Sequence, residues 1–262
     1  MPDSRYCYPD SDVLVNKLNI RDKDDLFTAE VELTSIRLNE LQNAPIEGSF
    51  DFNHLKNIHK YIFQDIYDWA GKERTVEIGK GNLFCLVSCI NEYAQSVFKK
   101  YYPQCYDAKD DFDLFIKTFA DNYGDLNALH PFREGNGRTQ REFARLICLK
   151  CGYDFDLSCI THNQMLEASK CSFNTGDNAG FIEIFSKAVK KQCDSNDDVN
   201  RLKILTMDDL IIDKDNDYDY YDYVDNHQVD VYEELYRTKI KKMYSEISDL
   251  ENIISSKKVT RE

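Results

Sequence analysis

The sequence predicts a mainly α-helical protein with one main domain. Only ten glycines and five prolines occur in 262 residues, and the apolar residues recur at spacings of three and four rather than two. With 42% hydrophobic and 13% aromatic residues, a chain of this length can bury one good core and a small extension.

The expected helices follow one another along the chain. The first spans roughly 24–41, where the apolar stripe consists of Leu26, Ala29, Val31, Leu33, Ile36, Leu38 and Leu41. The second spans roughly 52–69 and is ended by Gly71, with an apolar face formed by Leu55, Ile58, Ile62, Ile66 and Trp69. Helical patterns then return at roughly 87–102, 111–129, 138–150, 161–172 and 179–192.

One segment shows a hairpin pattern instead of a helical one. In RTVEIGKGNLF, residues 74–84, apolar residues flank Gly79 and Gly81. This arrangement predicts two short strands joined by a tight turn.

The composition changes beyond about residue 193. The stretches DSNDDVN and DKDNDYDYYDYVDN are acidic and lack an apolar period, which is typical of a linker. The last segment carries apolar residues at alternating fours and threes and is expected to be a helix. We therefore expect an N-terminal segment and helix (1–50), a core (51–195), and an acidic linker with a C-terminal helix (196–262).

Charge and cysteine content limit the classes of function. With 33 basic and 47 acidic residues the formal charge is −14, so the molecule repels polyanions and nucleic acid binding is not expected. Nine cysteines, an odd number scattered through helical segments, favour reduced thiols in a cytoplasm. The N-terminus lacks a leader pattern and no apolar run is long enough for a membrane span, so we expect a cytoplasmic protein, or one exported by another route.

Residues 130–141 read HPFREGNGRTQR and are the most informative stretch of the chain. Asn136 and Gly137 stand just before an apolar helical pattern, which predicts a helix N-terminus whose N–H groups and dipole favour an anion. Gly135 and Gly137 allow the backbone to come close to that anion.

The charged residues of this stretch predict a phosphate site with a base beside it. Arg138, Arg141 and Arg145 can share one helix face and present guanidinium groups to several phosphate oxygens, which favours a polyphosphate ligand. Glu134 could hold Mg²⁺ together with substrate phosphates, and His130 could remove a proton from an incoming hydroxyl.

A base, a metal and cations are the set that phosphoryl-type transfer needs. A histidine before proline is also common in ordinary loops, and arginines on a helix often form a solvated face. The spacing alone therefore leaves catalysis and an ordinary surface both open.

The stretch HPFREGNGRTQR resembles the signature HPFx(D/E)GNGRxxR of the Fic (filamentation induced by cAMP) family, with every fixed position matched. YPDSDVLVNKLNI (8–20), FQDIYDWAGKERTVEIGKG (63–81) and DLNALHPF (125–132) resemble the N-terminal segment, flap region and motif lead-in of bacterial Fic proteins. The resemblance covers residue 6 to about residue 192. It implies a Fic fold, a helical bundle with a β-hairpin flap beside the active-site loop.

The resemblance also implies an activity, the transfer of AMP from ATP to a Ser, Thr or Tyr hydroxyl of a target protein with release of pyrophosphate. By position in the motif, His130 is the general base, Glu134 holds Mg²⁺ and Phe132 anchors the loop in the core. The attacking oxygen displaces pyrophosphate from the α-phosphorus in line.

The resemblance assigns the phosphates and the target to further positions. Gly135, Asn136 and Gly137 form the anion nest, and Asn136 also reaches the phosphates. Arg138 binds the β and γ phosphates and Arg141 completes the γ-phosphate site. The flap aligns the target by main-chain pairing, so substrate choice is expected to depend on Ile78, Gly79, Lys80 and Gly81. An ordinary hairpin is the alternative interpretation of the flap.

Alternative reactions belong to the same fold. The phosphotransferase branch that includes Doc has a shorter, altered glycine region, so the intact GNGR with Arg141 favours AMP transfer. Transfer of another nucleotide or of phosphocholine is a second alternative. A catalytically silent interaction protein is the least favoured interpretation.

The sequence lacks the inhibitory motif that restrains many Fic proteins. Many Fic proteins are restrained by a helix carrying Ser/Thr-x-x-x-Glu-Gly/Asn, whose Glu pairs with the second motif arginine, here Arg141. The nearest match, Glu251-Asn252, has its serine, Ser248, three residues back rather than four. We expect either a separate antitoxin, as in toxin members of the family, or restraint by the C-terminal extension, and favour the antitoxin. Exposed tail tyrosines also make self-modification a hypothesis, at Tyr218, Tyr220, Tyr221 and Tyr223.

Overall fold

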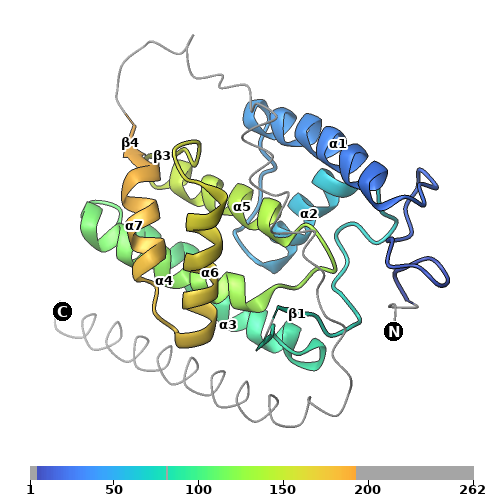
Figure 1. Ribbon diagram of the computed structural model, residues 1–262. Coiled ribbons are helices and arrows are strands. Elements are labelled where there is room, and N and C mark those ends of the chain that lie inside the picture. Colours follow the sequence, from blue (N-terminus) through green and yellow to red (C-terminus); the bar gives the residue numbers. More distant parts are fainter. Residues whose placement is uncertain (1–4, 81, 193–262) are drawn as a thin grey trace.

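The computed structural model describes residues 5–80 and 82–192, and this part of the chain is mainly helical, as the sequence predicts (Figure 1). The elements in chain order are α1 (Lys23–Asn43), α2 (Phe52–Phe63), β1 (Gly79–Lys80), β2 (Asn82–Leu83), η1 (Val87–Cys89), α3 (Ile90–Ala108), α4 (Phe112–Leu129), α5 (Asn136–Lys150), β3 (Tyr153–Phe155), α6 (His162–Thr175), α7 (Ala179–Ala188) and β4 (Val189–Lys191).

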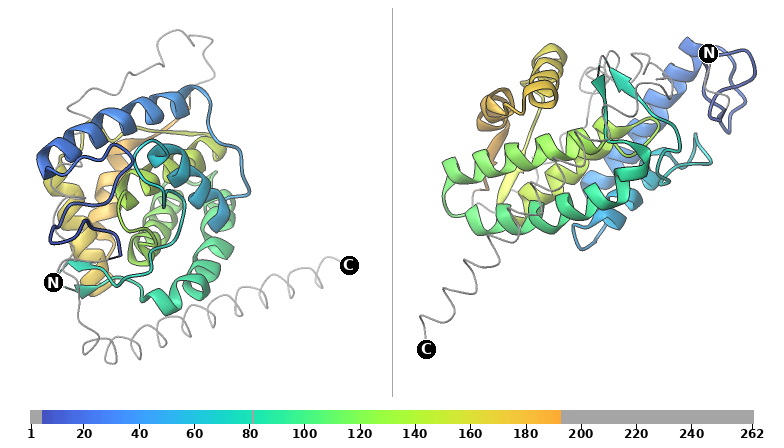
Figure 2. Two further views of the ribbon diagram at one scale, coloured as in Figure 1. Left: turned by 90° about the vertical axis from the view of Figure 1, so that its right-hand side faces the viewer. Right: turned by 90° about the horizontal axis from the view of Figure 1, so that it is seen from below.

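Helix α5, which carries half of the motif, packs against α2, α3 and α4. Its Phe143 is fully buried and meets the rings of Phe98 and Tyr101 of α3 at 5.5 and 6.0 Å. Figure 2 shows α3 and α4 side by side, with α6 and α7 forming a second pair of neighbouring helices. Because the motif ends α4 and opens α5, the aromatic core fixes both sides of the loop between them.

Helix α1 differs from the expected one in the side that it buries. Asp22 caps it by accepting from the N–H groups of Asp24 and Asp25 at 2.9 and 3.0 Å. The buried positions are Leu26, Glu30, Val31, Thr34, Leu38 and Leu41, whereas Ile36 is 55% exposed. The polar members of this stripe are tolerated in the core because they have polar partners on α5, described below.

Helix α2 ends earlier than its apolar pattern predicts. The N–H groups of Ile66 and Tyr67 both reach the carbonyl of Phe63 at 3.1 Å in a turn, yet Ile66 is still fully buried. The apolar spacing continues because the turn also packs on the core. Gly71 adopts φ 79° close to α2, where an added Cβ would lie 2.7 Å from that of Lys60.

Two small antiparallel sheets lie within the part of the chain that the structure describes. β1 and β2 pair in the register Gly79↔Leu83 and Lys80↔Asn82, inside the hairpin expected at 74–84. β3 and β4 pair as well, and this sheet was not predicted. The helix expected to run to 192 ends at Ala188 instead, because an apolar residue at the junction fits a strand as well as a helix.

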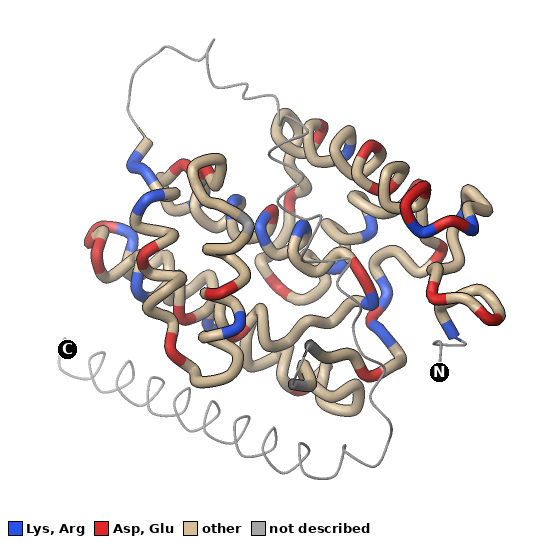
Figure 3. The backbone as a smooth tube through the Cα atoms, in the orientation of Figure 1, with Lys and Arg blue, Asp and Glu red and all other residues tan. Residues whose placement is uncertain are grey.

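Within residues 5–80 and 82–192, no helix is both long and apolar enough to cross a bilayer, and no disulfide joins the cysteines. Figure 3 shows Lys and Arg interspersed with Asp and Glu along the helices. The expected linker and C-terminal helix, the tail tyrosines and Gly81 lie outside the described residues. The division into three parts stays a prediction.

Candidate active site

Two residues with positive φ set the course of the motif loop. Helix α4 ends at Leu129 and is followed by His130, which takes the left-handed conformation at φ 42°, and α5 begins after Gly135 at φ 78°. A Cβ at Gly135 would lie 2.1 Å from the Phe63 ring, so only glycine fits there. His130 is not a glycine, so its positive φ is strained, and residues strained in this way are concentrated at functional sites.

His130 is held in one orientation at the edge of the loop. It is 6% exposed, and its ring stacks on Phe84 with the centroids 3.8 Å apart and the planes 14° from parallel. Its Nδ1 lies 3.0 Å from the carbonyl oxygen of Asn127. A carbonyl can only accept, so Nδ1 carries the proton in the neutral ring and Nε2 carries the lone pair.

The loop is closed from the inside by Asn136 and Phe132. The Asn136 side chain, fully buried, accepts from Phe132 N at 2.9 Å and donates to Phe132 O at 2.8 Å. The Phe132 ring stacks on His59 at 3.8 Å, so this residue lies in the core as expected. The Asn136 amide therefore acts within the loop, and its expected contact with phosphates would have to come from its main-chain N–H.

His59 of α2 supports the loop from below and was not expected to have a role. Its Nδ1 accepts from Gly71 N at 2.8 Å, so Nε2 is the protonated nitrogen and donates to the carbonyl of Glu134 at 2.9 Å. Complete burial lowers the pKa of His59 from 6.5 to about 3. The imidazole is therefore neutral and serves as a fixed strut between α2 and the motif.

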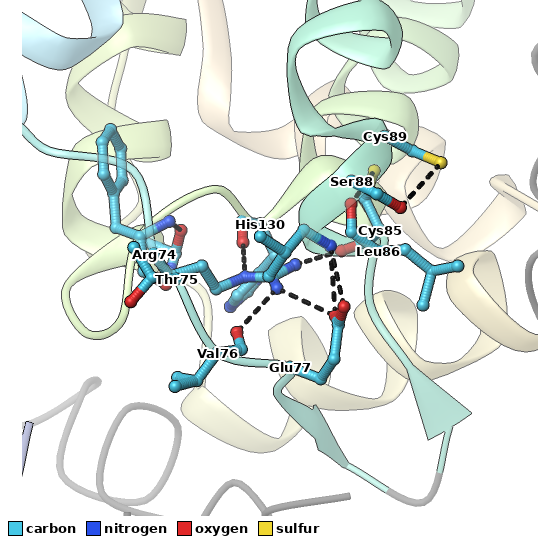
Figure 4. A network of polar contacts seen from close by, with 12 residues as sticks. Arg74, Thr75, Val76, Glu77, Cys85, Leu86, Ser88, Cys89 and His130 are labelled. Carbon is cyan, nitrogen blue, oxygen red and sulfur yellow. Dashed lines mark hydrogen bonds and ion pairs between the residues drawn. The ribbon is translucent and has the colours of Figure 1, made fainter. Parts of the chain in front are cut away.

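Arg74 joins the base of the flap to the motif loop (Figure 4). Its side chain is buried, with Nε donating to His130 O at 2.9 Å, Nη1 to Val76 O at 3.0 Å and Nη2 to Cys85 O. Its main-chain N–H donates to Pro131 O at 2.8 Å. Glu77 pairs with Arg74 at 3.3 Å and accepts from Val87 N at 3.0 Å. One guanidinium thus fixes both ends of the flap against His130.

Glu134 and Arg138 face one another at the start of α5. Glu134 is 4% exposed, and its Oε1 accepts from Gly135 N at 2.8 Å and lies 3.6 Å from Arg138 Nη2. Arg138 is also 4% exposed and reaches across to α1, where its partners are the carboxylate of Glu30 and the hydroxyl of Thr34. The guanidinium of Arg138 is therefore oriented by two helices.

The three arginines do not face one ligand together. Arg141 lines a cavity beside His130, while Arg145 pairs with Glu142 at 2.7 Å and donates to Leu41 O at 3.1 Å. Arg138 and Arg145 are seven residues apart and both lie on the α1 side of α5, but Arg138 also reaches Glu134 of the motif, 3.6 Å from its Oε1. The interpretation that Arg145 joins the phosphate-binding face does not hold.

The cavity has a volume of about 80 Å³ and lies between the motif and α6. His130, Gly137 and Arg141 contribute to it from the motif, and Phe84 from the flap. Helix α6 supplies the opposite wall with Met165, Leu166, Ser169, Lys170, Phe173 and Asn174. A base, an arginine and a helix N-terminus therefore open on one space, which suits a phosphorylated ligand.

Glu134 can bind a magnesium ion only if a substrate supplies further oxygen ligands. Glu134 offers a buried carboxylate beside the helix N-terminus. Among the described residues no group of three or more His, Cys, Asp or Glu side chains could enclose a metal. One carboxylate completed by phosphate oxygens and water is a common way in which proteins hold Mg²⁺.

The flap residues divide between core and hairpin. Ile78 is 2% exposed, so its side chain packs in the core and its carbonyl accepts from Phe84 N at 3.1 Å. Gly79 and Lys80 form β1. Any contribution of Ile78 to substrate choice would therefore come from its main chain.

Sequence reasoning missed Glu30, His59 and Arg74. One signal was available for Glu30, since it lies on the spacing of Leu26, Thr34 and Leu38, inside a stripe that is otherwise mostly apolar. A charged residue on a core-facing stripe indicates a buried partner.

Comparison with known proteins agrees with this geometry. A family model described as "Fic/DOC family" matches residues 49–148. The chain is 37% identical to the probable protein adenylyltransferase y4lH of Sinorhizobium fredii over 64% of this chain and 87% of that one. It is 32% identical to the probable protein adenylyltransferase Fic of Escherichia coli over 72% of this chain and 94% of that one.

A longer relative and a solved structure extend the comparison. The protein adenylyltransferase VbhT of Bartonella schoenbuchensis is 39% identical over 63% of this chain, and the match spans 34% of VbhT. The N-terminal Fic domain of a cell filamentation protein from Bartonella quintana, solved with bound ADP, superposes with a TM-score of 0.66 at 25% identity, covering 73% of this chain and 97% of that one. The full motif, the fold and these relatives agree, and the chain belongs to the Fic/DOC family.

Proposed function

We propose that this protein is a protein adenylyltransferase that moves AMP from ATP to a Ser, Thr or Tyr hydroxyl of a target protein. The observation that carries the proposal is the place of His130, whose ring is fixed by Asn127 and Phe84 at a cavity that Gly137 and Arg141 also line. Relatives named as adenylyltransferases, matched over most of their length, support the same reaction.

The reaction begins with a proton transfer to His130. Nε2 carries the lone pair in the neutral ring, so it takes the proton of the target hydroxyl as that oxygen attacks the α-phosphorus of ATP. The new bond joins the target oxygen to phosphorus, and the bond from phosphorus to the bridging oxygen breaks with its electrons on pyrophosphate. The products are the AMP-modified side chain, pyrophosphate and a proton held on His130.

The phosphates bind at the start of α5 in this proposal. The main-chain N–H groups of Asn136 and Gly137 point along the helix axis toward the anion, and helix geometry gives them no acceptor within the helix. Arg141 meets the γ-phosphate in the cavity, and Arg138 acts on the β and γ phosphates from the base of the helix. When bound, Mg²⁺ supplies further neutralisation of the phosphates, and Glu134 is the residue that would hold it.

The target docks on the flap in this proposal. β1 and β2 are a two-stranded hairpin, and an extended target segment can add to its edge through main-chain hydrogen bonds. Because Arg74 ties both ends of the flap to the loop, a target aligned by Gly79 and Lys80 would be registered against His130.

Intact mass spectrometry tests the reaction. Wild type and His130→Ala are incubated with ATP and MgCl₂, with and without a lysate of candidate targets. A His130-dependent adduct of AMP mass, on a target or on the tail tyrosines, is expected. An adduct of phosphate mass would instead assign the chain to the phosphotransferase branch. His130→Ala should keep the melting temperature of wild type to within a few degrees, so that lost activity is not lost folding.

Control of the site can be read in the same experiment. We propose that a separate antitoxin restrains the enzyme, because no Ser/Thr-x-x-x-Glu-Gly/Asn sequence occurs in the chain. The purified full chain should then be active alone. A chain that is inactive alone and becomes active without residues 196–262 would show that the extension is the restraint.

A further inference from the structure

Helix α1 places a buried carboxylate behind the motif. Glu30 is 1% exposed, and its two oxygens accept from Arg138 Nη2 and from the hydroxyl of Tyr67. A carboxylate buried to this extent is strongly destabilising unless it is paired and hydrogen-bonded. Its geometry is therefore determined by these two partners.

Thr34, one turn further along α1, engages the other terminal nitrogen of the same guanidinium. Its Oγ1 accepts from Arg138 Nη1 at 3.2 Å and donates to the carbonyl of Glu30 at 2.7 Å. Because the hydroxyl proton is directed to that carbonyl, the oxygen presents its lone pairs to Arg138. Glu30 and Thr34 thus hold Nη2 and Nη1 of one guanidinium plane.

Arg138 also contacts α2, through Phe63, and the motif loop, through Glu134. Its guanidinium carbon lies 4.7 Å from the centre of the Phe63 ring, and Nη2 lies 3.6 Å from Oε1 of Glu134. One cation is therefore shared by two buried carboxylates, Glu30 behind and Glu134 in front. If Glu30 lost its charge, Arg138 would be drawn to Glu134, away from its present orientation.

We propose that Glu30 is a positioning residue of the active site, which sets the guanidinium of Arg138 for the polyphosphate of the nucleotide. The inference rests on the proposed function in that it assumes the phosphates meet Arg138. It makes α1 a part of the nucleotide site.

Glu142 provides a matched comparison. It is also a buried carboxylate, its side chain 2% exposed, and it pairs with an arginine of α5, Arg145, that reaches the end of α1. This pair lies one to two turns further along α5 than Arg138. Loss of a buried carboxylate by itself should therefore have the same consequences at both positions, and only Glu30 should affect the nucleotide.

Nucleotide binding is the first test, measured by isothermal titration of the full chain with ATP and separately with AMP, both with MgCl₂. Glu30→Gln is expected to raise the dissociation constant of ATP about tenfold and to leave that of AMP within about twofold, because AMP has no β or γ phosphate. Glu142→Gln is expected to leave both unchanged. Equal weakening of ATP and AMP, or no weakening of either, would overturn the proposal.

Transfer kinetics give the second test, through a double-mutant cycle of Glu30→Gln with Arg138→Met. A residue that acts only through Arg138 lowers kcat/KM in the wild-type background, by about tenfold or more, and adds nothing once Arg138 is absent. Multiplying losses would overturn the proposal. Glu30→Asp, which keeps the charge, should recover part of the loss.

Folding and the proposed function are separated by two further measurements. Thr34→Val removes one acceptor of Arg138 and keeps the charge of Glu30, so it decides the matter by the same ATP and AMP titrations if Glu30→Gln does not fold. If wild type transfers no AMP to any target, the proposed function fails, while the titrations still decide the role of Glu30.

Discussion

The motif loop and the flap lie against each other, and they are held very differently. The loop is fixed at His130, Phe132, Glu134 and Asn136 by contacts that come from α2, α4, α5 and the flap base. The tip of the flap consists of two strands of two residues, and its base depends on Arg74. The chemistry thus has a support from several helices, while the hairpin proposed to meet varied targets is short and is tied to the loop by Arg74 at its base.

Replacing Arg74 should have the largest effect, because its guanidinium donates to the motif loop and to both ends of the flap. Arg74→Met leaves the carbonyls of His130, Val76 and Cys85 without their buried donor. We expect the free energy of unfolding to fall by about 3–5 kcal/mol, as for other broken buried ionic networks. Urea unfolding followed by circular dichroism measures it.

The matched control is the Lys56–Glu73 pair just before the flap, 3.2 Å apart, with both side chains 25% exposed. Lys56→Met should change the free energy of unfolding by no more than about 1 kcal/mol. If Arg74→Met lowered the free energy of unfolding as little as this control, Arg74 would not be what holds the flap and the loop together.

The second prediction concerns His59, which supports the loop and has no counterpart in the flap. Its pKa is about 3 in the folded protein and near 6.5 when unfolded, so between these values the unfolded chain binds one more proton. The free energy of unfolding should therefore fall as the pH is lowered through this window, by about 1.4 kcal/mol per pH unit from this residue. His59→Gln should lack that part of the slope.

Urea unfolding of wild type and His59→Gln at several pH values between neutral and acid measures the difference. Carboxylates that titrate in the same range contribute equally to both proteins, so only the difference in slope reports His59. Parallel curves would mean that His59 is protonated in the folded protein, and the strut between Gly71 and Glu134 would need another explanation.

What the sequence could predict depends on how far apart in the chain the interacting residues lie. The motif loop and the helix start that follows it could be predicted, because the loop is built from neighbours such as Asn136 and Phe132, four residues apart. The catalytic and binding roles of its residues stay predictions. The bounds of α4 were also accurate, since Asp111 caps its start and the motif ends it.

The supports of the motif could not be named, because their partners are remote. Glu30 is 108 residues from Arg138, His59 is 75 from Glu134, and Arg74 is 56 from His130. A polar residue on a core-facing stripe shows that a buried partner exists, but the sequence does not say which one. The end of α2 was missed for a related reason, since the turn after it keeps an apolar spacing against the same core.

The smallest effect should come from replacing Phe84, the flap residue whose ring stacks on His130. Phe84→Leu removes the ring that stacks on His130 at 3.8 Å and leaves the hydrogen bond from Nδ1 to Asn127 in place. A stacked pair contributes about 0.5–1.5 kcal/mol, so kcat should fall by about two- to tenfold because the imidazole is held less firmly.

The matched control is Phe173 of α6, which lines the same cavity and whose ring centre lies 5.0 Å from that of Phe84. Phe173→Leu therefore controls for the loss of a cavity ring. If both variants lowered kcat equally, the flap would act on His130 only by filling space. A fall confined to Phe84→Leu would mean that the flap, despite its short strands, takes part in holding the catalytic base.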